Sequence, residues 1–105
     1  MAAFRVVFIT VPPETAEELS QKIVENKLAA CINIVDRVKS IYHWKGVIKK
    51  DVESLLIVKT TTKKVERLIK FVKENHSYEI PEVVALTISE GNPDYLDWLD
   101  RETSQ

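Results

Sequence analysis

The sequence is poor in the residues that form hinges, disulfide staples and phosphate-binding loops. Only two glycines and one cysteine occur among its 105 residues. A nucleotide- or dinucleotide-binding loop needs several glycines within a short span, so this class of site is excluded. The single cysteine, Cys31, can form no disulfide within the chain, which favours a reducing compartment.

Long apolar runs and an excess of one charge are also missing. No stretch approaches the ~20 apolar residues that a membrane-spanning helix needs. The first residues show no charged segment followed by an apolar one, so we expect no signal peptide. The formal net charge of −1 lacks the basic field on which non-specific nucleic-acid binding depends. We therefore expect a cytoplasmic protein with no membrane and no nucleic-acid partner.

What is present is the composition of one globular domain. The chain has 45% hydrophobic and 30% charged residues, and its length falls within the ~100–200 residues typical of a domain. A chain of this size buries roughly two-thirds of the surface that its unfolded form exposes. No linker, internal repeat or low-complexity tract divides it, so we expect a single domain over residues 1–105.

The hydrophobic pattern alternates between strand-like runs and helix-like spacing. The predicted order is a strand 4–11, a helix 15–27, a strand that starts at 28 and continues loosely to 48, a strand 52–61, a helix 63–75, a strand 83–89 and a short helix from 92. Crossover handedness and the placing of helices on one sheet face make this order an α+β fold of the ferredoxin-like type. It is a split β-α-β-β-α-β with a short C-terminal helix.

Capping residues mark the predicted helix boundaries. Thr15 and Glu18 have the spacing of a capping box at the start of the first helix. Asn92 followed by Pro93 predicts the start of the last helix, since asparagine caps well and proline suits the first helical position. The second helix is expected to carry its lysines on its outer face.

The two central strands form the most unusual predicted feature. Lys49-Lys50-Asp51 is a short polar break between them, so an antiparallel hairpin is predicted with its turn there. Its first arm exceeds the ~3–10 residues of ordinary strands. An arm that projects beyond its own sheet exposes edges on which another chain can pair. The pattern therefore predicts self-association.

Metal-ligating side chains of nitrogen and sulfur are few. Cys31, His43 and His76 are the only ones, and they share no short metal-binding spacing. The apolar run around Cys31 favours a core position for its thiol. His43, between two aromatic residues, favours a solvent-facing strand position.

His76 stands at a predicted helix end beside a phenol and two carboxylates, those of Tyr78, Glu79 and Glu82. Two interpretations are open. The imidazole caps the helix C-terminus, where cations are favoured, or it belongs to a polar cluster that binds a cation or a small polar ligand.

Other chemistry is sparse. No nucleophile elbow or serine triad is recognisable, so we expect no enzyme activity, with an acid–base site built between subunits as the minor alternative. The third strand lacks the stacking aromatics of RNA-recognition modules. Lys59, followed by three threonines at a helix start, indicates either an anion site or a lysine whose stem covers apolar surface.

Several motifs together resemble one family over residues 6–99. They are Thr10-Val11-Pro12, Leu28-Ala29-Ala30-Cys31-Ile32-Asn33, Ser40-Ile41-Tyr42-His43-Trp44-Lys45-Gly46, Asp51-Val52-Glu53, Lys59-Thr60, His76-Ser77-Tyr78-Glu79-Ile80-Pro81-Glu82 and Tyr95-Leu96-Asp97-Trp98. In this order and chain length, they resemble the CutA family of divalent-cation tolerance proteins. The family's histidine-proline-tyrosine segment has Ser77 here in place of the proline, which frees the turn before Tyr78.

The resemblance implies a ferredoxin-like homotrimer in which the long hairpin and sheet edges pair between subunits, an assembly like that of the PII signalling proteins. It implies copper or other divalent-cation tolerance in the cytoplasm and no catalytic activity. It also implies a set of polar residues around the clefts between subunits. We predict that this set comprises Lys59, Tyr78, Tyr42, Trp44 and Cys31, with His76, Glu79 and Glu82 as metal ligands.

The leading hypothesis is thus a homotrimer that weakly binds copper(II) or another divalent cation at its inter-subunit clefts, with no tightly bound cofactor. His76 is its predicted nitrogen ligand, and Asn75 stands before it where a second histidine would strengthen the site. The alternative hypothesis is a PII-like trimeric signalling or binding module that takes a small anionic ligand at the same cleft, through Lys59.

Overall fold

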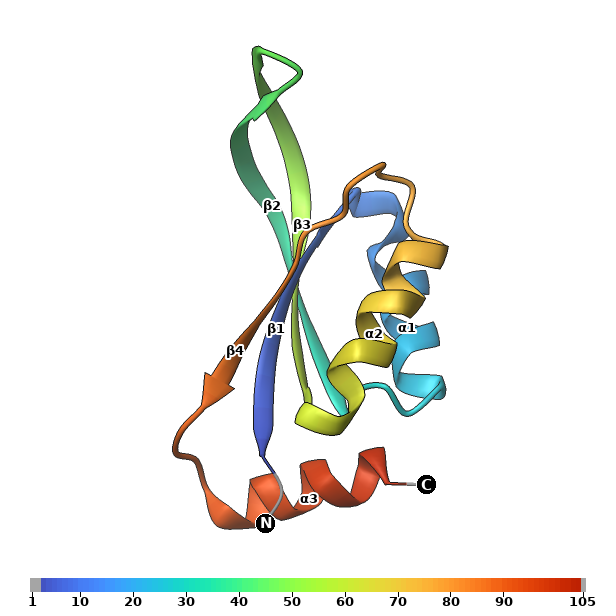
Figure 1. Ribbon diagram of the computed structural model, residues 1–105, viewed down its shortest axis with the longest axis vertical. Helices are drawn as coiled ribbons and strands as arrows, with labels where there is room; N and C mark the ends of the chain where they lie inside the picture. Colours follow the sequence, from blue (N-terminus) through green and yellow to red (C-terminus); the bar gives the residue numbers. More distant parts are fainter. Residues whose placement is uncertain (1–2, 105) are drawn as a thin grey trace.

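Four antiparallel strands carry two helices on one face and a third helix across one end (Figure 1). The computed structural model describes residues 3–104. Its elements are β1 (Phe4–Val11), a 3-10 turn (Pro13–Thr15), α1 (Ala16–Glu25), β2 (Cys31–Trp44), β3 (Val47–Thr61), α2 (Thr62–Asn75), β4 (Val83–Ile88) and α3 (Pro93–Thr103). The predicted order of strands and helices is confirmed. None of the helices in the described part of the chain is both long and apolar enough to cross a membrane.

The strand order in the sheet is β2-β3-β1-β4, and every neighbouring pair is antiparallel. Strands β1 and β2 therefore run parallel with β3 inserted between them, which is the split βαβ arrangement. Phe4 of β1 lies opposite Thr61 on one side and Ile88 on the other, so the register of three strands is fixed from one end. The predicted ferredoxin-like fold is confirmed.

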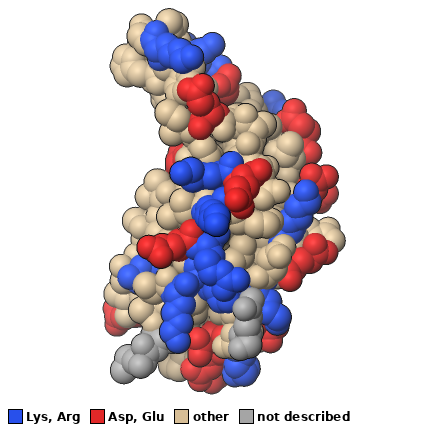
Figure 2. All heavy atoms as spheres, turned by 45° about the vertical axis from the view of Figure 1, so that its right-hand side comes forward, with Lys and Arg blue, Asp and Glu red and all other residues tan. Residues whose placement is uncertain are grey.

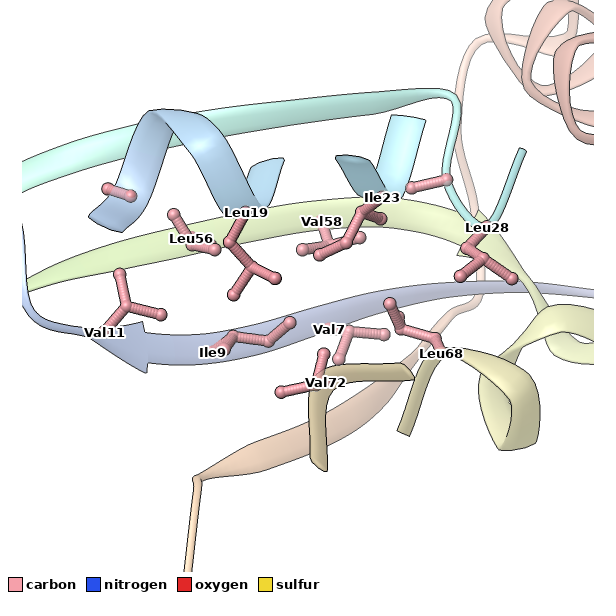
Figure 3. Packing of buried hydrophobic residues seen from close by; sticks show 12 residues of the cluster. Val7, Ile9, Val11, Leu19, Ile23, Leu28, Leu56, Val58, Leu68 and Val72 are labelled. Atoms are coloured by element: carbon pink, nitrogen blue, oxygen red, sulfur yellow. The ribbon is translucent and has the colours of Figure 1, made fainter. Parts of the chain in front are cut away.

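The hydrophobic core lies between the sheet and helices α1 and α2 (Figure 3). Alternate residues of each strand point to the helical side, because successive side chains in a strand face opposite ways. The helices present residues spaced by three or four to the same layer. The fully or nearly fully buried side chains that Figure 3 labels are Val7, Ile9, Val11, Leu19, Ile23, Leu28, Leu56, Val58, Leu68 and Val72.

One lysine of α2 does not follow the prediction that all its lysines face outward. Lys64 occupies the same stripe as Leu68 and Val72, at spacings of four, and only 8% of its surface is exposed. The prediction was wrong for this residue because the stripe that faces the sheet begins in the first turn of the helix, where a lysine stands instead of an apolar residue.

The start of α1 differs from the predicted capping box. A 3-10 turn over Pro13–Thr15 precedes the helix, and no side chain caps its N-terminus. The Thr15 hydroxyl instead donates to the carbonyl of Pro12 at 3.0 Å. The predicted start of α3 is confirmed, since Asn92 Oδ1 accepts from the backbone N–H of Asp94 at 3.0 Å.

The hairpin of β2 and β3 projects well beyond the sheet, as predicted (Figure 1). The last pair between β1 and β3 joins Val11 to Ser54, so the outer part of the hairpin pairs only with itself. A bulge between Val35 and Val38 interrupts the ladder at the point where the hairpin leaves the sheet. The longest dimension of the molecule, 45 Å, follows from this projection.

The hairpin turn lies at Lys45-Gly46, and the prediction of a turn at residues 49–51 was wrong. Both turn residues have positive φ, 51° for Lys45 and 81° for Gly46, as a two-residue hairpin turn that matches strand twist requires. The polar residues 49–51 are tolerated inside β3 because neither face of the projecting hairpin packs on the core of its own chain. Polarity therefore marks exposure here and not a chain reversal.

Strand β2 begins later than the apolar pattern indicates. Leu28 and Ala29 are buried in the connection after α1, where the Thr60 hydroxyl donates to the carbonyl of Leu28 at 2.7 Å. Cys31, the first residue of β2, is only half-buried and lies outside the core cluster. The interpretation of its thiol as a core group was wrong, because it faces the side of the sheet that the helices leave open.

The turn can be tested through Gly46, since a Cβ added there meets no atom within 4 Å. Gly46→Ala should therefore weaken the hairpin through backbone conformation alone, by about 1–2 kcal/mol. Gly46→Asn is the matched control, because asparagine tolerates positive φ and should cost much less. Native-state hydrogen exchange of the hairpin amides measures both. Equal protection in the two variants would show that the turn conformation does not limit hairpin stability.

Candidate functional site

A cavity of about 670 Å³ opens where the hairpin leaves the sheet and meets the segment between α2 and β4. That segment arches from the end of α2 back toward β4 (Figure 1). The cavity is lined by side chains from β1, both arms of the hairpin and the arching segment. They are Thr10, Ser40, Ile41, Tyr42, Trp44, Lys49, Asp51, Glu53, Tyr78, Glu79, Ile80 and Glu82. We call this cavity the acidic pocket.

The alternation of β3 supplies one wall of the acidic pocket. Lys49, Asp51 and Glu53 are separated by two residues each, so their side chains share one face of the strand. Their partners Tyr42 and Ser40 on β2 share the same face, because directly opposite residues of antiparallel strands point the same way. One stretch of hairpin thus places charged and phenolic groups side by side.

A partly buried hydrogen bond joins the two walls of the pocket. The Tyr78 hydroxyl donates to Glu53 Oε2 at 2.7 Å, and only 6% of Glu53 is exposed. Burial raises the pKa of Tyr78, and the hydrogen bond to Glu53 and the nearby carboxylates raise it further. The phenol therefore stays protonated and is the donor that this buried carboxylate requires.

A second phenol–carboxylate pair lies further out on the hairpin. The Tyr42 hydroxyl donates to Asp51 Oδ2. This hydrogen bond, followed by desolvation and the charges of Asp51 and Glu53, raises the pKa of Tyr42. Each of the two β3 carboxylates therefore has one tyrosine that fixes its orientation.

His76 does not line the pocket, but it contacts two residues that do, Thr10 and Tyr78. It occupies the C-cap position of α2, and its Nε2 lies 2.8 Å from the carbonyl of Thr10 in β1. Among the described residues the ring bonds no carbonyl of the helix, so the interpretation of the imidazole as a helix cap was wrong. Its Nδ1 accepts from the backbone N–H of Tyr78 at 3.0 Å, so Nε2 carries the proton that Thr10 accepts. The ring also lies against Tyr78, with centroids 4.5 Å apart. Both nitrogens are thus engaged, and the imidazole has no free lone pair for a metal ion in this arrangement.

The charge balance of the pocket favours cations. Four carboxylates, those of Asp51, Glu53, Glu79 and Glu82, line it with a single lysine, Lys49. Aspartate and glutamate oxygens are the ligands that hard divalent cations prefer. Within residues 3–104, however, no three histidine, cysteine, aspartate or glutamate side chains converge closely enough to hold a metal ion. The described part of one chain therefore offers carboxylate ligands for such an ion but not a complete set of ligands around it.

The structure brings together some of the predicted site residues and separates others. Tyr42, Trp44, Tyr78, Glu79 and Glu82 all line the acidic pocket. Asp51 and Glu53 were not predicted as site residues. The sequence does contain a pattern that points to them, since Asp51 and Glu53 alternate along one strand. This pattern identifies them as neighbours of Tyr42 only when the hairpin register is known.

Lys59 and Cys31 lie elsewhere. Lys59 stands six residues along β3 from Glu53, or roughly 20 Å at the rise of a strand. Its Nζ donates to Asn33 Oδ1 and lies 3.9 Å from Cys31 Sγ. Tyr95 of α3 borders this group, where burial and then Cys31 raise the pKa of its phenol. The two predicted residues therefore form a separate polar cluster within one chain.

Comparisons with known sequences give a consistent result. The family model described as CutA1 divalent ion tolerance protein matches residues 5–102. Divalent-cation tolerance protein CutA of Thermus thermophilus is 52% identical over 99 residues, which cover 93% of this chain and 96% of that protein. Protein CutA 1, chloroplastic, of Oryza sativa subsp. japonica is 46% identical over 101 residues. That match covers 95% of this chain and 57% of the rice protein, so the chain spans little more than half of that relative.

Solved structures give the same likeness in three dimensions. The crystal structure of CutA1 from Oryza sativa matches with a TM-score of 0.95 and 44% identity, over 98% of this chain and 95% of that one. The PII-like protein CutA from Nostoc sp. PCC 7120 matches with a TM-score of 0.89 and 33% identity, over 95% and 97% of the two chains. The region matched by the family model, 5–102, includes every residue that lines the acidic pocket.

The buried pair of Tyr78 and Glu53 yields a stability prediction. Tyr78→Phe should lower the free energy of unfolding by about 1–3 kcal/mol, because the carboxylate of Glu53 stays buried without its donor. Adding Glu53→Gln to Tyr78→Phe should recover part of the loss, since a neutral amide costs less to bury than a carboxylate. Urea unfolding at one fixed protein concentration measures both. Simple additivity of the two substitutions would contradict the coupling.

The same pair predicts an alkaline effect. The pKa of Tyr78 is raised in the native state above its ordinary value of 10.0. The phenol of the unfolded chain ionises first, so the stability that this group contributes is complete below about pH 10 and is lost as the pH rises beyond that value. The free energy of unfolding should therefore fall less steeply above pH 10 in Tyr78→Phe than in the wild type. Parallel curves would exclude this linkage.

Proposed function

The chain belongs to the CutA1 divalent ion tolerance protein family, and from this premise we propose that it binds divalent cations weakly at the acidic pocket and so contributes to tolerance of these ions. The observation that carries the proposal is the lining of the pocket, where four carboxylates face one lysine. Such a lining attracts cations and disfavours a small anion at the same place. The proposal assigns the pocket to binding and not to catalysis.

The four carboxylates of the pocket have two different roles in this proposal. Glu79 and Glu82 are exposed and carry carboxylates that an arriving ion reaches directly. Asp51 and Glu53 are held by their tyrosines and supply fixed negative charge. Since no three ligands converge in one chain, the ion keeps much of its water or takes a further ligand from a neighbouring copy. Either case gives weak binding.

Copper(II), the ion expected from the sequence, favours imidazole nitrogen more than carboxylate oxygen. Direct ligation by His76 would require its ring to release either the Thr10 carbonyl or the Tyr78 N–H. We therefore propose that His76 positions Tyr78 while the carboxylates hold the ion, copper among others.

Self-association into a homotrimer belongs to the same proposal. Val84 and Leu86 of β4 lie on the side of the sheet opposite the helices, and each is 47% exposed. Ile41, Val47 and Ile48 on the projecting hairpin are 58–69% exposed. Apolar surface of this extent on a sheet face and a free hairpin is typical of protein interfaces. A second and third copy would cover it and place further ligands near each pocket.

A cytoplasmic location completes the proposal. The single free thiol of Cys31 suits a reducing compartment. The name of the rice relative, a chloroplastic protein, shows that relatives also occur in other compartments.

Cation binding can be tested by titrating the metal-stripped protein with Mn²⁺ and, separately, Cu²⁺ in a calorimeter. The double substitution Glu79→Gln with Glu82→Gln should lower the affinity for both ions by about tenfold or more, since an uncharged amide oxygen replaces each accessible carboxylate. Glu74→Gln with Glu90→Gln makes the same charge change outside the pocket and serves as the control. An equal loss in the control would mean that only net charge matters.

The role of His76 follows from the same titration. If the ring positions Tyr78 without touching the ion, His76→Gln should change the affinities for Mn²⁺ and Cu²⁺ by the same factor. A loss confined to Cu²⁺ would instead show direct ligation by the imidazole.

The homotrimer can be tested by sedimentation equilibrium. The wild type should have three times the chain mass of 12.1 kDa. Val84→Glu should yield the mass of one chain, because it puts a charge into the proposed interface. Val24→Glu is the matched control, since Val24 is 40% exposed on α1 and lies away from the open sheet face. A trimer that survives Val84→Glu would place the interface elsewhere.

A further inference from the structure

The acidic pocket is larger and more apolar than a metal ion requires. Ligand oxygens surround a bound divalent cation at about 2.0–2.6 Å, so the ion itself needs little space. The cavity measures about 670 Å³, which falls within the ~300–1,000 Å³ of pockets that hold small organic molecules. Its aromatic and alkyl lining consists of Tyr42, Trp44, Tyr78, Ile41 and Ile80. These rings and alkyl groups offer nothing to a metal ion and much to an organic ligand.

The carboxylates of the pocket are spread out instead of converging. Asp51 and Glu53 each accept a hydrogen bond from a tyrosine. Within residues 3–104, no three histidine, cysteine, aspartate or glutamate side chains lie closely enough to hold a metal ion. An ammonium group has three N–H donors and is satisfied by one or two carboxylates beside an aromatic ring. The spacing of the acidic groups therefore suits an ammonium group better than a metal ion.

The indole ring of Trp44 already has an ammonium group beside it. The Nζ of Lys45 lies 5.6 Å from the centroid of this ring, within the ~6 Å of a cation–π contact. Lys45 belongs to the hairpin turn and does not line the pocket, whereas Trp44 does. Tryptophan attracts cations over its ring more strongly than tyrosine or phenylalanine. One wall of the pocket thus carries the aromatic surface that best recognises an organic cation.

Ile80 gives the pocket an exposed apolar edge. It is 71% exposed, the largest exposed fraction among the large hydrophobic residues of the described chain. It lies on the segment between α2 and β4, directly after Glu79 and two residues before Glu82. An apolar ligand that covers Ile80 removes apolar surface of both partners from water. Apolar surface between two carboxylates matches a ligand with a charged end and an apolar body.

The charges around the pocket favour a short cation over a long one. Figure 2 shows basic side chains at the tip of the projecting hairpin and acidic side chains below them. Lys45 stands in the turn, and Lys49 and Lys50 follow it on β3. A long polycation would meet these like charges, whereas a single ammonium group reaches the carboxylates alone.

We propose that the acidic pocket binds a small organic cation, a molecule with one ammonium group on an apolar body. The ammonium group contacts the ring of Trp44 and the carboxylates of Glu79 and Glu82, and the apolar body packs against Ile80. The proposal rests on the proposed function because it needs the attraction of the pocket for cations, and it adds the class of ligand. A divalent ion and the organic cation compete for the same carboxylates.

Calorimetry of the wild type with three matched probes tests the class of ligand. Phenethylammonium chloride has an ammonium group and an apolar body, phenethyl alcohol is its neutral analogue, and hydrocinnamate is its anionic analogue. The ammonium compound should bind about tenfold or more tightly than the alcohol, because only its charge pairs with the carboxylates. The anion should show no binding. Equal affinity for the ammonium compound and the alcohol, or no binding of the ammonium compound, would overturn the proposal.

Substitutions locate the organic cation in the pocket. Trp44→Leu removes the ring face and should lower the affinity for phenethylammonium by about threefold or more. Ile80→Gln should act in the same direction and leaves folding intact, because this side chain is largely exposed. Both should affect Mn²⁺ binding less, since neither removes a carboxylate. Trp98→Leu on α3 is the matched control outside the pocket. An equal loss in Trp98→Leu and Trp44→Leu would contradict the location.

Competition distinguishes this proposal from the metal proposal. Mn²⁺ should weaken the binding of phenethylammonium, because both use Glu79 and Glu82. Binding of Mn²⁺ without binding of phenethylammonium would overturn the organic ligand and leave the metal proposal standing. Binding of phenethylammonium without binding of Mn²⁺ would overturn the metal ion and keep the organic ligand. Binding of phenethylammonium by Val84→Glu alone would mean that another copy of the chain fills the pocket in the assembly, which would also overturn a small-molecule ligand.

Discussion

Every functional position in this chain depends on the register in which β3 pairs with β1 and β2. Side chains alternate along a strand, so a slip of one residue would exchange the two faces. In the observed register, Leu56 and Val58 face the helices and build the core. The residues between and before them face the open side, where Glu53 and Asp51 form a wall of the acidic pocket. The same strand continues past the end of β1 as the projecting arm of the hairpin.

Two charged residues with low exposure, Glu53 and Lys64, differ in whether they have a hydrogen-bond partner. Glu53 receives a hydrogen bond from Tyr78, and His76 holds the backbone of Tyr78 in place. This network is satisfied within the chain, so it contributes to rigidity. Lys64 has no such partner among the described residues, but its ammonium nitrogen is not among the buried polar atoms that lack a hydrogen bond. A buried carboxylate therefore needs a donor from its own chain, whereas a lysine can bury its stem and keep its charge in water.

Local patterns predicted the regular elements well and the special positions poorly. The limits of β1 and α2 followed from β-branched runs and helical spacing, because burial of one face determines both. The hairpin turn was misplaced, since a projecting hairpin has no buried face whose pattern would reveal it. Thr15 has the right spacing for a capping box, but Pro12 and Pro13 impose a 3-10 turn that takes its hydroxyl.

The candidate site shows the same division. The resemblance to a family identified Tyr42, Trp44 and the segment from 78 to 82, and these residues do line one cavity. It also placed Lys59 with them around clefts between subunits, and within one chain six residues of strand separate Lys59 from Glu53. Only the register reveals that separation. The engagement of His76 depends on the carbonyl of Thr10, 66 positions away in the chain, which no local pattern contains.

The layout of side chains separates the acidic pocket from the surface proposed for self-association. Asp51 and Glu53 line the pocket at the base of the hairpin. Val84 and Leu86 of β4 carry half-exposed apolar side chains on the open face of the sheet. A further copy of the chain that packs on β4 therefore buries apolar surface and leaves the carboxylates of the pocket in place.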